Sequence, residues 1–120
     1  MAEVVYLAPS GSTANGNYGG SALHNGAWEA FALQFVVEAA GGSPTVTYQF
    51  QGSLDGVNWY PIGYVTDASD TISTASRVRT SVGTDVCFIS NPVARRYTFI
   101  RCVVSGINNV TFRAEAWRVD

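Results

Sequence analysis

One serine and one histidine are the first residues to test for catalysis. Ser53 directly follows Gly52 in the stretch GSLDG at residues 52–56. This stretch does not match the G-x-S-x-G nucleophile elbow. In that motif one residue separates the first glycine from the serine, and the serine lies on a strand-to-helix turn, whereas Ser53 follows Gly52 directly in a predicted hairpin. Ser53 also has no base nearby. His24 is the only histidine, so a His-based triad or a multi-histidine metal site would need a neighbouring chain. We therefore predict no catalytic residue and no enzymatic activity.

The sequence also contains little evidence for a metal or cofactor site. Asp67 and Asp70 flank a short loop, but two carboxylates without the rest of a calcium loop's ligand series are typical of a solvated turn. No glycine-rich loop that could cradle a phosphate is present. Cys87 and Cys102 are expected to be reduced, buried small hydrophobes. The sequence predicts no metal and no cofactor.

Arginine supplies all seven basic residues of the chain. Arg77 and Arg79 share one face of a candidate strand, and Arg95 and Arg96 precede the strongest one. They are either solvated charges that keep an edge from pairing, or anchors for carboxylates of a partner protein. The net charge is -2, whereas a surface that binds nucleic-acid phosphates carries an excess of positive charge. We therefore expect no nucleic-acid partner.

Composition indicates one globular domain with a weakly charged surface. The chain has 120 residues, of which 47% are hydrophobic and 13% are charged. Serine, threonine, asparagine, glutamine and glycine must then supply the polar surface, which suits burial against a partner. No stretch approaches the roughly 18 apolar residues that cross a bilayer, and the start lacks the features of a signal peptide. We expect no membrane partner and synthesis in the cytoplasm without Sec export.

The apolar pattern has a period of two along most of the chain. In residues 28–38, Phe31, Leu33, Phe35 and Val37 alternate with other residues, and residues 45–51 continue this pattern beyond a turn at residues 39–44. Residues 28–38 also contain good helix formers, but the alternation favours a strand. Further strands are predicted at residues 59–66, 77–80, 85–89, 97–104 and 110–119. Such short strands predict an all-β antiparallel β-sandwich or jelly-roll-like barrel over residues 27–120.

Residues 1–26 are predicted to form a flexible, extended N-terminal arm. They are rich in glycine, serine and asparagine, and contain one apolar run, Val4, Val5, Tyr6 and Leu7. This composition buries too little surface to hold a packed element. The arm is either a loose terminus or a segment that adds a strand to a partner's sheet. In both cases it should be removable without unfolding the sandwich.

Aromatic side chains allow a second kind of function. Six of them could form a stacking surface for sugars: Trp28, Trp59, Trp117, Tyr18, Tyr60 and Tyr64. Residues of this kind more often fill the core of a small sandwich. Trp59 follows a turn and begins a strand, so we expect it in the core.

An Asp-Gly pair at residues 55–56 predicts a tight hairpin turn. The pattern G-S-x-D-G-x-x-W, here Gly52, Ser53, Asp55, Gly56 and Trp59, resembles a hairpin of small β-sandwich virion proteins of tailed bacteriophages. Residues 96–103, with the turn and alternating strand that follow, resemble the closing hairpin of the same proteins. Together the resemblance covers roughly residues 28–118.

Within these virion proteins, the chain is most similar to capsid decoration, or cement, proteins. The resemblance implies a structural protein that binds the major capsid protein on the outer surface of the virion. It also implies self-association, as a homotrimer near local threefold axes. The same superfamily includes host-adsorption and tail proteins, so a glycan-binding or host-adsorption module and a tail structural protein are the alternatives.

Overall fold

The computed structural model describes residues 4–22, 31–90, 93 and 97–118. Its regular structure in these ranges is a set of antiparallel β-strands, which confirms the predicted all-β class. The strands are β1 (Val4–Ser12), β2 (Gly16–Ala22), β3 (Phe31–Ser53), β4 (Tyr60–Pro61), β5 (Tyr64–Thr66), β6 (Ser69–Ser73), β7 (Arg77–Arg79), β8 (Gly83–Ile89) and β9 (Phe99–Arg118).

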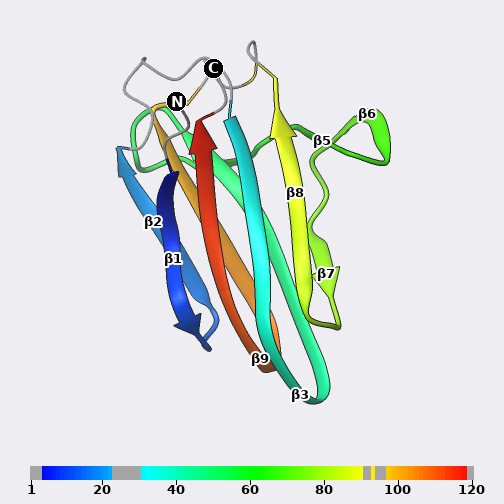
Figure 1. Ribbon diagram of the computed structural model, residues 1–120. Helices are drawn as coiled ribbons and strands as arrows, with labels where there is room; N and C mark the ends of the chain where they lie inside the picture. The colour runs from blue at the N-terminus through cyan, green and yellow to red at the C-terminus, as the bar shows by residue number, and fades with distance from the viewer. Residues whose placement is uncertain (1–3, 23–30, 91–92, 94–96, 119–120) are drawn as a thin grey trace.

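Two long strands, β3 and β9, run through both layers of the sandwich. Residues 31–40 of β3 pair with residues 110–118 of β9, and residues 45–53 pair with residues 99–108. Both strands reverse direction together at one end of the molecule (Figure 1). One continuous sheet is thus folded over on itself, and its two halves face each other.

Shorter strands complete each half of the folded sheet. In one layer, β1 pairs with the last part of β9, and β8 pairs with the first part of β3. In the other layer, β2 pairs with the first part of β9, while β7 and β4 pair with the second part of β3. The β5–β6 hairpin is joined to the outer side of β8.

The core lies between the two layers, as the period-two pattern predicts. Phe35 in the first layer stacks on Tyr48 in the second, with ring centroids 4.0 Å apart. Phe112 packs beside Phe35 and meets the edge of Tyr18 from β2. Alternate residues of β3 and β9 are accordingly buried, so the sheet needs no helix to cover its apolar face.

The predicted turns at residues 39–44 and 105–109 lie where the two long strands fold over. Ser43, Gly106 and Asn109 have positive φ angles of 51°, 58° and 52°. Asparagine and glycine tolerate this left-handed backbone well. The segments before and after the β3 turn both pair with β9, and those before and after the β9 turn both pair with β3. Each turn therefore carries its strand from one layer of the sandwich to the other.

The predicted flexible arm is wrong for residues 4–22. These residues form β1 and β2, and β9 supplies the backbone hydrogen bonds of both. Leu7 and Ala8 lie in the core, and Tyr18 packs against it. A glycine-rich segment can hold this place because β9 pairs with its backbone N–H and C=O groups, and because Leu7, Ala8 and Tyr18 pack in or against the core.

Three local predictions also need correction. Residues 59–66 form two short strands, β4 and β5, because Ile62 between them turns into the core and is 1% exposed. Strand β6 is missing from the prediction. The Asp-Gly pair lies inside a longer loop between Ser53 and Tyr60, since β3 ends at Ser53 and β4 begins at Tyr60.

Candidate functional site

Two of the predicted partner-binding arginines are engaged within the chain. Arg79 Nη1 lies 2.7 Å from Asp85 Oδ1, and Arg77 Nη2 lies 3.7 Å from the same oxygen. Tyr48 donates a hydrogen bond of 2.7 Å to the other oxygen of Asp85. Burial and the Asp85 hydrogen bond raise the pKa of Tyr48 well above its ordinary value. Neither sequence reading of these arginines foresaw this internal role, in which they join β7 to β8 at one side of the sandwich.

Both cysteines are free and buried, as the sequence predicts. Burial raises the pKa of both thiols. Arg77 also donates a hydrogen bond of 3.5 Å to Cys87 Sγ, and this contact lowers the Cys87 pKa without cancelling the effect of burial. A buried thiol of raised pKa is a poor nucleophile.

The apolar run Val4, Val5, Tyr6 and Leu7 is divided between the core and the surface. Leu7 is buried, whereas Tyr6 is 58% exposed. The run already pairs with residues 115–117 of β9, so it is an edge strand of this chain. Its role in binding a partner stays a prediction. Arg95 and Arg96, like His24 and Trp28, lie outside the described residues.

The carboxylate of Glu38, on β3, holds the last residues of β1. Glu38 accepts hydrogen bonds from Ser10 Oγ at 2.6 Å and from Gly11 N at 2.8 Å, and Arg113 Nη1 lies 3.0 Å away. These contacts, the Ser10 hydroxyl above all, lower the pKa of Glu38 from its ordinary value of 4.5.

We expect the Glu38 contacts to make stability depend on pH. Because the folded-state pKa is lowered, their contribution is fully present above pH 4.5 and is lost as the pH falls through the folded-state value. Glu38→Gln should lower the free energy of unfolding by about 1 kcal/mol at pH 7, with a smaller effect at low pH. Urea unfolding at several pH values measures this difference. A difference that does not shrink in acid would contradict the assignment.

The 53–58 loop, Ser53 to Asn58, is held by its own side chains. Asp55 Oδ1 accepts hydrogen bonds from the backbone N–H groups of Val57 and Asn58, both 2.8 Å long, and from Ser53 Oγ at 2.9 Å. Ser53 Oγ in turn accepts a bond from Gly56 N. Gly56 has a φ of 77°. Ser53 is fully buried, and its hydroxyl belongs to the hydrogen bonds that hold this loop.

Apolar side chains project from this rigid loop into solvent. Leu54 is 71% exposed, Val57 is 77% exposed, and Tyr60, on the next strand, is 59% exposed. A hollow of about 170 Å³ lies beside them, lined by Leu54, Asp55, Asn58, Tyr60 and Tyr97. The loop lies at the end of the sandwich opposite the turns of β3 and β9. Exposed apolar groups on an ordered loop are typical of a protein-binding surface.

The predicted core position of Trp59 is wrong. Its side chain is only half-buried and is absent from the core cluster. Its ring lies under the guanidinium of Arg101, with the carbon of that group 4.4 Å from the ring centroid. Arg101 also donates two hydrogen bonds to Gln51 Oε1. Trp59 is thus part of a stacked polar cluster on the outer face of the second layer.

The other aromatic candidates differ in exposure. Tyr18 packs against the core, and Tyr64 is half-buried with its hydroxyl bonded to Ala75 O. Trp117 is half-buried, and its Nε1 is enclosed without a hydrogen-bond partner among the described residues. Tyr60 is therefore the most solvent-exposed of the predicted aromatic residues that the structure describes.

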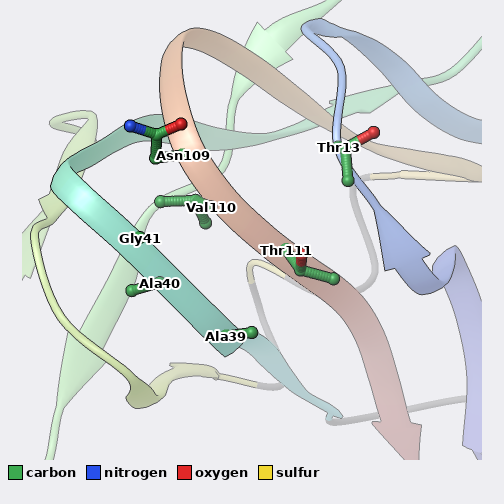
Figure 2. A pocket seen from close by; sticks show the side chains of 7 residues that line it. All are labelled: Thr13, Ala39, Ala40, Gly41, Asn109, Val110 and Thr111. Atoms are coloured by element: carbon green, nitrogen blue, oxygen red, sulfur yellow. The ribbon is translucent and has the colours of Figure 1, made fainter.

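A wider hollow of about 520 Å³ lies at the folded end of the sheet (Figure 2). Its lining is Thr13, Ala39, Ala40, Gly41, Asn109, Val110 and Thr111. These side chains are small, and none is acidic, basic or a thiol, so the hollow lacks an acid–base pair.

Two other kinds of site are absent from the part of the chain that the structure describes. The described residues contain no group of three or more histidine, cysteine, aspartate or glutamate side chains placed to hold a metal ion. Within the same ranges, no helix has the length and apolar character needed to cross a membrane.

The sequence analysis did not predict that the 53–58 loop exposes apolar side chains, because it interpreted the Asp-Gly pair only as a hairpin turn. The available signal was the set of large apolar residues inside a polar turn, Leu54 and Val57, next to Tyr60. Turn residues are usually polar, so apolar residues held there indicate contact with something else.

The fold resembles that of known proteins, although the sequence does not. No protein-family model matches the chain, and no curated protein matches it. The SPBc2 prophage-derived protein YomS, known from a crystal structure, has a similar fold with a TM-score of 0.66 at 3% identity. The match covers 100% of this chain and 94% of that one. It shows a shared fold along the whole chain.

Two other structures are less similar. Bacillus endospore appendages, described as disulfide-linked pili, give a TM-score of 0.42, and the coat protein dimer of Tobacco streak virus gives 0.45. Each is 8% identical, and each match covers 98% of this chain and 84% of the other. These two likenesses are too weak to carry an inference.

Proposed function

We propose that this protein is a non-enzymatic structural protein of a bacteriophage virion that decorates the outer surface of the capsid. Its partner is the major capsid protein, and it binds the lattice as a homotrimer. The observation that carries the proposal is the fold shared along the whole chain with a prophage-derived protein. The sequence resemblance to phage virion proteins at residues 52–59 and 96–103 supports the same origin.

Surface chemistry supports binding to protein. Leu54, Val57 and Tyr60 present apolar groups on an ordered loop and the strand after it. On the outer face of the first layer, Arg113 is paired with both Glu38 and Glu115. Charges that are already paired within the chain can be covered by a partner without leaving a lone ion buried. Several such weak contacts on each copy would strengthen one another across a lattice.

Binding to capsids is the decisive test. Purified protein is mixed with expanded, undecorated capsids, and the particles are imaged by cryo-electron microscopy. We expect ordered added density at repeated positions on the outer surface, with three copies around local threefold axes. Leu54→Ser with Val57→Ser should reduce the occupancy, whereas Thr71→Ala, at an exposed residue of β6, should not. Bare capsids after mixing would contradict the proposal.

The glycan-binding or host-adsorption alternative is favoured by one observation, the exposure of Tyr60. A sugar would stack its apolar face on that ring. Changes in tyrosine fluorescence on addition of host surface polysaccharide, together with bare capsids in the mixing experiment, would support adsorption instead. Density on tail tubes would support the tail alternative.

A further inference from the structure

Among the residues that the structure describes, the negative charge of Asp55 in the 53–58 loop has no positive partner. The backbone N–H groups of Asn58 and Val57 hold the pKa of Asp55 well below its usual range, so the carboxylate is ionised at neutral pH. Among the described residues, the salt bridges involve Asp85, Glu38 and Glu115, and none involves Asp55. Within the described residues, Asp55 Oδ2 accepts one hydrogen bond, from Asn58 Nδ2, and keeps a free lone pair.

Two tyrosine rings lie beside this charge. Tyr60 is the register partner of Gly52, so the two residues point to the same face of the sheet. The ring of Tyr97 lies directly over Gly52, where a side chain would otherwise be. Both rings therefore face the same side, and with Leu54, Asp55 and Asn58 they line the hollow of about 170 Å³.

We propose that this hollow receives a basic side chain, arginine or lysine, of the partner protein. The inference takes the identity of that partner, the major capsid protein, from the proposed function. Aromatic rings attract a cation through their electron-rich faces, and a nearby carboxylate adds a direct charge interaction. The chain contains a comparable contact of its own, since Arg101 lies over the ring of Trp59 at 4.4 Å.

A sugar fits the same hollow less well. Asp55 Oδ1 already accepts three hydrogen bonds, and Asn58 Nδ2 is bonded to Asp55 Oδ2. The lining is mostly apolar. The several hydroxyl groups of a sugar would lose their bonds to water and find few partners there. A single cation would be bound by the Asp55 carboxylate and the rings of Tyr60 and Tyr97 alone.

The first experiment uses the whole protein and a small peptide. A Gly-Arg-Gly peptide with blocked ends is titrated into ¹⁵N-labelled protein, with Gly-Gln-Gly and glucose as parallel ligands. We expect saturable shifts of the Asp55 to Asn58 amide signals with the arginine peptide, weakened by salt. No saturable shift with arginine, or equal shifts with glutamine or glucose, would overturn the inference.

Three variants test the parts of the site. Tyr60→Ala should weaken binding of the arginine peptide about two- to fivefold, whereas Tyr60→Phe, which keeps the ring, should bind as the wild type does. Asp55→Asn keeps an acceptor oxygen for the loop and should weaken binding about fivefold. If Tyr60→Phe loses as much affinity as Tyr60→Ala, the ring face is not what binds, and the inference is wrong.

Capsid binding separates this inference from the proposed function. If capsids are decorated equally by wild type, Tyr60→Ala and Asp55→Asn, the cation site is wrong while the decoration role stands. If the arginine peptide binds but capsids stay bare, the cation site stands and the decoration role fails.

Discussion

Removing residues 1–20 is expected to unfold the protein. In the structure this segment supplies β1 and most of β2, which cover the two layers on one side through pairing with β9. Leu7, 7% exposed, and the ring of Tyr18 enter the core. Their loss would expose apolar side chains of both layers and leave β9 with an unpaired edge.

A single substitution isolates the core contribution of this segment. Leu7→Ala should lower the free energy of unfolding by about 2 to 4 kcal/mol, because it removes a buried side chain from a packed site. Tyr6→Ala, at the neighbouring exposed residue of the same strand, should change it by less than about 0.5 kcal/mol. Urea unfolding followed by circular dichroism measures both, and the truncated chain should show no cooperative transition. A truncated chain with the wild-type transition would support the flexible arm after all.

Gly52→Ala is expected to have the second large effect. A methyl group at this position would overlap the ring of Tyr97, because the three atoms nearest to it all belong to that ring. The ring is packed against the core, so it cannot move aside without losing contacts. We expect a loss of about 1 to 3 kcal/mol in the free energy of unfolding, which is the usual cost of overpacking.

Two companion variants show whether the Tyr97 ring is the cause. Gly42→Ala introduces the same methyl group where no atom lies within 4 Å, and should have little effect. In a Tyr97→Ala background, Gly52→Ala should cost less than about 1 kcal/mol, since the overlap is gone. Equal losses for Gly52→Ala with and without the ring would contradict this explanation.

Most of the sandwich could be predicted from the sequence. The alternation in the first part of β3 follows from a sheet with one face in the core, and it predicted which side chains, Phe31 and Phe35 among them, lie inside. The N-terminal strands could not be predicted in this way. Their stability comes from β9, whose paired residues lie from 77 positions (Ala22 to Phe99) to 113 positions (Val4 to Trp117) later in the chain, and a local pattern does not carry that information.

The candidate site shows a similar division. The roles of Ser53 and Gly56 within a turn follow from residue type, because short polar side chains and glycine suit turns. The position of Trp59 does not follow from residue type. Its half-buried place under Arg101 depends on the pairing of Gln51 on β3 with Arg101 on β9. The close approach of Tyr97 to Gly52 likewise arises from tertiary structure.

The folded-over sheet has a consequence for how the protein is made. Phe31 pairs with Arg118, and Ser53 pairs with Phe99, so β3 leaves the ribosome long before its partner strand exists. Until β9 has been synthesised, β3 can pair only with β4, β7 and β8, and the N-terminal strands β1 and β2 have no edge to join. Contacts between such distant residues form slowly. Folding of the sandwich should therefore wait until β9 has been made, and the nascent chain is exposed to chaperones and to aggregation during that interval.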